Sequence, residues 1–146
     1  MEAVILVGIQ GSGKTTFYRE RFFDTHVRLS LDLLKTRARL RALMKTCIAT
    51  GQPFVIDNTN VLAAERREYI DAAKAAGFHV IGYFFQPELR RAIKWNSLRA
   101  GKRAIPVAGL IGTMKRLEKP TPEVGFDELR EVTVDAENRF VVSAMP

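Results

Sequence analysis

The fold of this chain is decided by GIQGSGKT, residues 8–15, which fits the pattern G-x-x-x-x-G-K-[ST] and follows an apolar run at residues 3–7. In a phosphate-binding loop, backbone N–H groups converge on phosphate oxygens, and glycine adopts the dihedral angles that this requires. A strand before the loop and a helix after it separate such a loop from a chance match. This context disfavours the alternative, a glycine-rich turn with an exposed lysine, and predicts a nucleoside triphosphate site.

The side chains of this loop have distinct expected roles. Lys14 is expected to contact the β- and γ-phosphates, and Thr15 is expected to be a ligand of Mg²⁺. ATP or another nucleoside triphosphate (NTP) is the expected phosphoryl donor. The predicted NTP-binding residues of the loop and its helix are Gly8, Gly11, Ser12, Gly13, Lys14, Thr15 and Thr16.

The rest of the chain alternates short apolar runs with longer segments of helical character. We expect strands over residues 3–7, 27–31, 54–56 and 80–85, and helices over 32–49, over 63–76 and from Pro87 onward. Such alternation predicts an α/β domain with a parallel sheet. The helix over 32–49 has an apolar stripe: Leu33, Leu40, Leu43, Met44, Cys47 and Ile48. A last strand or hairpin is expected over about 131–143, within one domain spanning residues 1–146.

Length and composition narrow the class of protein. The chain has 146 residues, of which 47% are hydrophobic, enough for one globular domain. Its net charge of +7 favours an anionic partner such as nucleic acid, nucleotide or an acidic surface. The apolar runs are far shorter than the ~20 residues that span a bilayer, and the single cysteine excludes an internal disulfide. We therefore expect a cytoplasmic protein with no membrane association.

An acidic residue, Asp32, follows the second expected strand. The carboxyl end of a parallel strand is where such sheets bind ligands, and a carboxylate there can accept the proton of an attacking hydroxyl group. The alternative is a helix N-cap or first-turn acid stabilised by the helix dipole. The sequence leaves both interpretations open.

A second acidic residue, Asp57, ends the third expected strand and begins the sequence Asp-Asn-Thr-Asn. An apolar strand that ends in an acid is typical of a Walker-B-like element, so Asp57 is predicted to support Mg²⁺ or to orient the acceptor. The alternative is that Asn60 simply caps the next helix. Three polar residues after the aspartate exceed what a cap needs, which favours a functional role.

Two windows of the sequence are strongly basic. Residues 28–45 hold Arg28, Lys35, Arg37, Arg39, Arg41 and Lys45, and residues 90–103 hold Arg90, Arg91, Lys94, Arg99, Lys102 and Arg103. Such runs are usually solvated faces, but Gly101 and Pro106 predict a loop over about 99–106. This loop would bring Arg99 and Arg103 over the NTP as a lid, where they would neutralise charge on the γ-phosphoryl group. For Trp95 in the same window, packing against the core is favoured over stacking on a base.

Together these motifs resemble the kinase domain of the polynucleotide 5′-kinases, as in the kinase-phosphatases of nucleic-acid repair. The resemblance runs from Val4 to about Leu129 and rests on residues 8–16, Asp32, residues 55–60, residues 96–99 with 105–106, and residues 122–126. The phosphate loop is generic to many NTPases. The Asp-Asn-Thr-Asn sequence followed by an arginine-rich lid is far more particular to this family.

The resemblance implies transfer of the γ-phosphoryl group to the 5′-hydroxyl end of RNA or DNA. It implies that Asp32 is the general base, that Lys14 and Arg99 are catalytic, and that Arg99 and Arg103 are lid arginines on the NTP. Thr15 and Asp57 would hold Mg²⁺. The implied fold is a P-loop kinase-type parallel sheet with helices on both faces and an arginine-rich lid. The implied acceptor-binding residues are Lys35, Arg37, Asp57, Asn58 and Thr59.

The chain departs from the family at Lys35, where phage and bacterial members carry an arginine that grips the acceptor phosphate. Lysine lacks the bidentate fork of arginine, so either the grip is weaker or Arg37 replaces it. The sequence contains no Asp-x-Asp-x-Thr pattern, so 3′-phosphatase and ligase activities are expected from separate proteins. Two other functions stay open: a kinase of a small-molecule hydroxyl group and a weak ATPase that serves as an interaction module.

Overall fold

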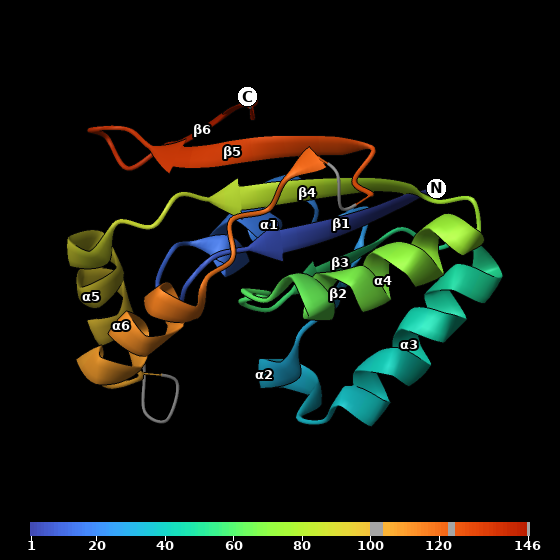
Figure 1. The fold of residues 1–146 in the computed structure, drawn as a ribbon, viewed down its shortest axis with the longest axis horizontal. Helices are drawn as coiled ribbons and strands as arrows, with labels where there is room; N and C mark the ends of the chain where they lie inside the picture. The colour runs from blue at the N-terminus through green and yellow to red at the C-terminus, as the bar shows by residue number, and fades with distance from the viewer. Residues whose placement is uncertain (100–103, 123–124, 146) are drawn as a thin grey trace.

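A six-stranded sheet with helices on both faces forms the body of the molecule (Figure 1), in a computed structural model that describes residues 1–99, 104–122 and 125–145. The order of the strands across the sheet is β2-β3-β1-β4-β5-β6. Every neighbouring pair is parallel except β5 and β6, which are antiparallel. The strands are β1 (Glu2–Val7), β2 (Val27–Leu29), β3 (Phe54–Asp57), β4 (His79–Phe85), β5 (Glu128–Val134) and β6 (Phe140–Ala144).

Six helices connect or flank these strands. They are α1 (Lys14–Arg21), α2 (Leu31–Leu34), α3 (Arg37–Thr50), α4 (Ala63–Ala75), α5 (Leu89–Ser97) and α6 (Val107–Arg116). Figure 1 shows α3 and α4 together on one side of the sheet, and α5 beside α6 beyond the carboxyl end of β4. Among the helices of the described residues, none is both long and apolar enough to cross a membrane.

The alternation of side chains along β1 creates two cores, one on each face of the sheet. Ala3, Ile5 and Val7 pack with apolar residues of α3 and α4, whereas Val4 and Leu6 pack with apolar residues of α1. All five are buried. A strand that is buried on both faces is typical of a parallel sheet covered by helices, and it places the end of β1 at the centre of the carboxyl edge.

The expected parallel α/β fold is confirmed, but one helix is not continuous. The helix expected over 32–49 is divided into α2 and α3 at Lys35, whose φ is 74°. Ser30 and Thr36 each accept a backbone N–H with the side-chain oxygen and so begin separate helices. Leu33 and Leu43 are exposed, whereas Leu40, Met44 and Cys47 are buried in the core and Ile48 packs against them.

Asn60 does not cap a helix, so the alternative considered from the sequence is wrong. It is fully buried in the left-handed region, with a φ of 50°, and its side-chain amide donates to the carbonyl oxygen of Leu6 at 2.7 Å. The N-cap position of α4 belongs to Leu62, which has no side-chain cap. Asn60 therefore joins the end of β3 to the end of β1.

This role predicts that Asn60→Gly destabilises the protein more than Asn138→Gly does. Both asparagines have positive φ, but Asn138 is in the exposed turn between β5 and β6 and its side chain has no hydrogen-bond partner among the described residues. Glycine keeps both backbone conformations, so the difference reports the loss of the buried side chain, of which the amide bond to Leu6 contributes about 1–3 kcal/mol to the free energy of unfolding. Urea unfolding of both variants measures this difference. Equal losses in the two variants would contradict the assigned role.

Candidate active site

The phosphate loop connects β1 to α1 at the carboxyl edge of the sheet. Gly11 and Gly13 have φ values of 75° and 92°, in the left-handed region that favours glycine. A side chain on Gly11 would collide with the carbonyl oxygen of Ala92 in α5. The N–H of Gly8 donates to the carbonyl oxygen of Thr59 at 3.0 Å. The loop is thus held between α5 and the segment that follows β3.

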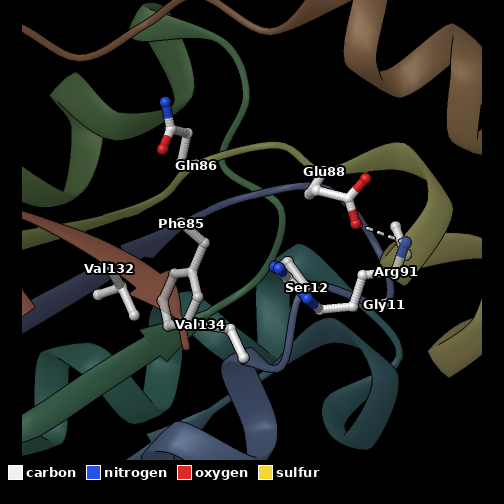
Figure 2. Close-up of a pocket in the computed structure, with 9 residues that line it drawn as sticks. Gly11, Ser12, Phe85, Gln86, Glu88, Arg91, Val132 and Val134 are labelled. Atoms are coloured by element: carbon white, nitrogen blue, oxygen red, sulfur yellow. Dashed lines mark hydrogen bonds between the residues drawn. The ribbon is translucent and has the colours of Figure 1, made fainter. Parts of the chain in front are cut away.

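A recess of about 330 Å³ lies next to this loop. It is lined by Gln86, Pro87, Glu88, Arg91, Thr133 and Val134. A smaller hollow, drawn in Figure 2, shares several of these residues and is also lined by Gly11 and Ser12. Glu88 caps α5 by accepting the backbone N–H of Arg91 at 2.7 Å. The recess therefore lies between the ends of β4 and β5, and the smaller hollow lies between it and the phosphate loop.

Trp95, in α5, also lies next to the phosphate loop. A Cβ atom placed on Gly13 would lie 2.9 Å from the Trp95 ring and 2.9 Å from the Phe140 ring, so both rings border the start of α1. Trp95 is only partly buried, and the Arg91 guanidinium carbon is 5.7 Å from the centroid of its ring. Trp95 therefore borders the phosphate loop with part of its surface open to solvent.

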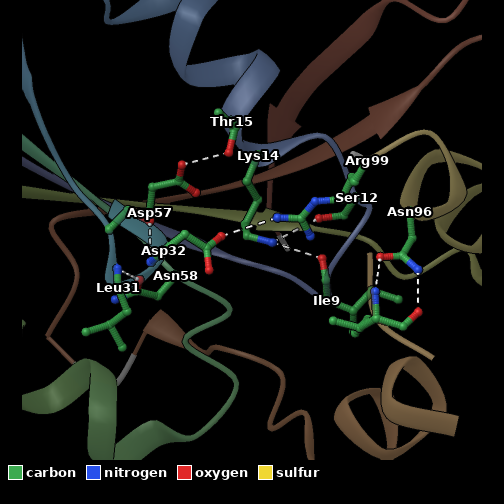
Figure 3. Close-up of polar contacts among 12 residues, drawn as sticks. Ile9, Ser12, Lys14, Thr15, Leu31, Asp32, Asp57, Asn58, Asn96 and Arg99 are labelled. Atoms are coloured by element: carbon green, nitrogen blue, oxygen red, sulfur yellow. Dashed lines mark hydrogen bonds and ion pairs between the residues drawn. The ribbon is translucent and has the colours of Figure 1, made fainter. Parts of the chain in front are cut away.

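Lys14 is nearly buried, and the loop itself satisfies its ammonium group. The Nζ atom donates to the carbonyl oxygens of Gly8 at 3.0 Å and Ile9 at 2.9 Å, and lies 3.4 Å from Ser12 Oγ (Figure 3). Burial lowers the pKa of Lys14 to about 8, with Asp57 opposing this shift. Arg99 lowers this pKa further and Asp32 raises it, so charges from three separate elements act on the same ammonium group.

The carboxylate of Asp57 joins three elements of the fold. Its side chain is 3% exposed, and its Oδ2 atom accepts a hydrogen bond from Thr15 Oγ1 at 3.0 Å. The same oxygen accepts a hydrogen bond from Arg28 Nε in β2 at 2.7 Å. The sequence-based reasoning placed Arg28 only in a basic window. Its position inside a strand, between Val27 and Leu29, is the signal that it serves an internal partner.

The Thr15 hydroxyl and the Asp57 carboxylate fit Mg²⁺. They are hard oxygen donors 3.0 Å apart at the start of α1, and Mg²⁺ is usually bound by one or two protein oxygens together with phosphates. Within residues 1–99, 104–122 and 125–145, no group of three or more His, Cys, Asp or Glu forms a metal cluster. A metal at Thr15 and Asp57 would therefore share its coordination with a nucleotide.

Asp32 and Arg99 are brought together from distant parts of the sequence. Ser30 is the N-cap of α2, and Asp32 lies in the first turn with its side chain 70% exposed. Arg99 Nη2, beyond the end of α5, lies 3.3 Å from Asp32 Oδ2. Figure 3 shows this pair beside Lys14 and Ser12. An exposed carboxylate therefore lies at the phosphate loop with a cation from the opposite side of the site.

Asn58 and Thr59 connect the end of β3 to the rest of the site. Asn58 Oδ1 accepts the backbone N–H of Leu31 at 2.8 Å, which fixes the start of α2. The Nδ2 atom of Asn58 is buried and has no hydrogen-bond partner among the described residues. Thr59 acts through its carbonyl oxygen, which accepts the N–H of Gly8. Of these two residues, Asn58 therefore has a buried side-chain donor that no described residue accepts.

The other predicted site residues differ in where they lie relative to Asp32 and the phosphate loop. Lys35 Nζ donates to the carbonyl oxygen of Asp32 at 2.7 Å and stays close to that residue. Arg37 instead faces α4, where its guanidinium contacts Glu65 at 3.1 Å and the Tyr69 hydroxyl at 3.3 Å. Thr16 is exposed on α1. Arg103 and the middle of the loop expected over 99–106 lie outside the described residues.

Asn96, in α5, forms two hydrogen bonds with Ile105. It is buried, its Nδ2 donates to the carbonyl oxygen of Ile105 at 2.6 Å, and its Oδ1 accepts the N–H of Ile105 at 3.1 Å. Both bonds join α5 to the residues that lead into α6. Arg99 follows three residues after this anchor, so Asn96 also restrains the chain that carries Arg99.

A known protein family, described as an AAA domain, matches residues 24–120. The chain belongs to this family. The matched region of this chain begins after the phosphate loop and includes Asp32, Asp57 and Arg99. The phosphate loop at residues 8–15 lies outside the matched region.

A curated relative of this AAA domain is the bifunctional polynucleotide phosphatase/kinase of Schizosaccharomyces pombe, which is 27% identical over 135 residues. The match covers 90% of this chain and 33% of that protein, so the chain spans about a third of the length of this relative.

Solved structures share the fold at lower identity. A gluconokinase from Sinorhizobium meliloti has a TM-score of 0.63 at 16% identity, covering 90% of this chain and 82% of its own. Chaetomium thermophilum Kti12, in complex with ADP-AlF₃, has a TM-score of 0.64 at 17% identity, covering 93% and 92%. The fold of this AAA domain is therefore that of the P-loop kinases.

The lowered pKa of Lys14 predicts a pH dependence of stability. The unfolded lysine titrates near 10.5 and the folded one near 8, so the unfolded state binds more protons between these values. The contribution of Lys14 to the free energy of unfolding therefore rises with pH in this range, by about 2 kcal/mol between pH 7.5 and 10. Urea unfolding of the wild type and of Lys14→Met at both pH values checks this, because the variant lacks the titrating group. Parallel pH profiles would contradict it.

Proposed function

We propose that this chain transfers the γ-phosphoryl group of ATP or another NTP to the 5′-hydroxyl end of RNA or DNA. The observation that carries the proposal is the position of Asp32, an exposed carboxylate paired with Arg99 and close enough to Lys14 to affect its pKa. A kinase needs such a carboxylate to accept the proton of the attacking hydroxyl group. The name of the Schizosaccharomyces pombe relative supports the choice of a polynucleotide acceptor.

The proposed reaction is an in-line displacement at the γ-phosphorus. The 5′-oxygen forms the new P–O bond, the bond to the bridging β–γ oxygen breaks, and the nucleoside diphosphate leaves with that electron pair. Asp32 accepts the proton of the 5′-hydroxyl. Lys14 and Arg99 balance the negative charge on the transferring group, the kind of electrostatic stabilisation that accounts for much of catalysis. Mg²⁺, when bound by Thr15 and Asp57, supplies further neutralisation of the phosphates.

On the acceptor side, we propose contacts with the end of the nucleic acid rather than with a long track. Lys35 stays beside Asp32, and Asn58 Nδ2 is a buried donor without a partner among the described residues. Arg37 and Arg41 pair with Glu65 and Glu68 of α4. Lys35 is therefore better placed than Arg37 to grip the acceptor phosphate.

These ion pairs also favour a second candidate function, the phosphorylation of a small-molecule hydroxyl group. A polynucleotide track needs free cations to replace the counterions of many phosphates, and α3 has two arginines already paired with acids. A steep fall of acceptor affinity with salt would favour the polynucleotide. Separate phosphatase and ligase partners and a cytoplasmic location remain predictions.

Asp32→Asn tests the proposed reaction. The variant should lose 10²-fold or more of the transfer rate, roughly the contribution of general-base catalysis, while NTP binding is retained. The measurement is label transfer from ATP or GTP to a panel of 5′-hydroxyl RNA and DNA oligonucleotides and small alcohols. Asp24→Asn is the matched control, because Asp24 is an exposed carboxylate after α1. Unchanged transfer in Asp32→Asn, or label on small alcohols alone, would overturn the proposal.

The position of Trp95 predicts a signal for nucleotide binding. Trp95 is the single tryptophan of the chain, and its ring borders Gly13 of the phosphate loop. Binding of Mg·ATP at the loop should change the environment of this ring, and with it the intrinsic emission. Titration of the wild type should give a saturable change, and Lys14→Met should shift it to much higher nucleotide concentration. Calorimetric binding of Mg·ATP without any change in emission would contradict this assignment.

A further inference from the structure

Arg28 is a cation built into the site proposed for Mg²⁺. It lies in the middle of β2 with its side chain 23% exposed, and its Nε atom donates to Asp57 Oδ2 at 2.7 Å. Its Nη2 atom lies 3.4 Å from Thr15 Oγ1. The guanidinium therefore contacts both residues that are proposed to hold the metal.

We propose that Arg28 is a fixed counter-ion of Asp57 that prevents a divalent cation from binding tightly unless nucleotide phosphates arrive with it. This inference rests on the proposed metal site at Thr15 and Asp57. It adds a residue that sets the order of assembly, in which the metal binds as a complex with the nucleotide. Arg28 is thus a positioning residue and touches neither the acceptor nor the transferring phosphoryl group.

The charges around Asp57 support this inference. The described charges that act on Lys14 or contact Asp57 are the cations Arg28 and Arg99 and the anions Asp57 and Asp32, and Lys14 itself is a third cation. A bare divalent ion would add two positive charges to a site with a cationic excess, next to a guanidinium that stays charged at any ordinary pH. An NTP brings about four negative charges with its metal and reverses this balance.

Arg28 also has a structural effect, which the test must separate from its effect on the metal. A carboxylate as buried as Asp57 is costly without a partner, so any change at Arg28 is expected to lower stability. A purely structural role would not tighten the binding of a metal ion. The affinity for the metal in the absence of nucleotide is therefore the readout that decides.

The experiment measures Mn²⁺ binding by the electron paramagnetic resonance signal of the free ion, with the chain of residues 1–146 and without acceptor. Arg28→Gln should bind Mn²⁺ at least ten-fold more tightly than the wild type when no nucleotide is present. Arg28→Lys, which keeps the charge, should stay as weak as the wild type. With ADP present, the wild type and Arg28→Gln should differ by less than three-fold.

Two controls locate the effect. Arg19→Gln removes the same charge from an exposed position on α1 and should leave Mn²⁺ affinity unchanged. Adding Asp57→Asn to Arg28→Gln should abolish the gain. Arg28→Met, which keeps the apolar stem, provides a second neutral variant, and circular dichroism shows which variants are folded.

The proposal is overturned if a folded neutral variant binds Mn²⁺ no more tightly than the wild type. It is also overturned if Arg28→Lys gains affinity as the neutral variants do, or if the gain survives Asp57→Asn. These outcomes are independent of the proposed reaction, because they involve no acceptor and no transfer. If the wild type transfers no label to any 5′-hydroxyl end, the proposed function is contradicted, and the Mn²⁺ result is unaffected.

Discussion

The rest of the site depends on the buried carboxylate of Asp57. A carboxylate with 3% of its side chain exposed must be paired and hydrogen-bonded, and its partners come from two other elements, Thr15 of α1 and Arg28 of β2. These bonds tie the sheet edge strand β2 to the helix that follows the phosphate loop. The chemistry of the site and the packing of the sheet edge therefore share one constraint.

The three residues after Asp57 extend this constraint to the rest of the carboxyl edge. Asn58 holds the start of α2, Thr59 holds the phosphate loop through Gly8, and Asn60 holds the end of β1. Each bond links a different element to the end of β3. The position of Asp32 next to the loop follows from the first of these bonds, because Asn58 fixes the residue that precedes Asp32.

Much of the positive charge in residues 28–45 is paired within the protein. In the basic window at residues 28–45, Arg28 pairs with Asp57, and Lys35 donates to the carbonyl oxygen of Asp32. Arg37 and Arg41 form ion pairs with acidic residues of α4. Most of these cations therefore hold the fold together, and few are available for a long nucleic acid. Among the described residues, the cations that remain close to the site are Lys14, Arg99 and Lys35, and they suit a compact group of phosphates.

The sequence by itself predicted the strand over residues 3–7, the phosphate loop over 8–15 with a helix after it, and the parallel sheet, because hydrophobic period and local motif are properties of neighbouring residues. It also identified the candidate residues Asp32, Asp57 and Arg99. It could not show that α2 and α3 are separate, since a run of apolar residues at helical spacing conceals two successive caps. Nor could it pair Arg28 with Asp57, or Arg99 with Asp32, across 29 and 67 residues. Only the tertiary structure decided these contacts, because the sheet order places β2 beside β3 and Arg99, just after α5, lies against Asp32 in α2. The physical reason is that the partner of a charged side chain depends on which strands and helices lie side by side.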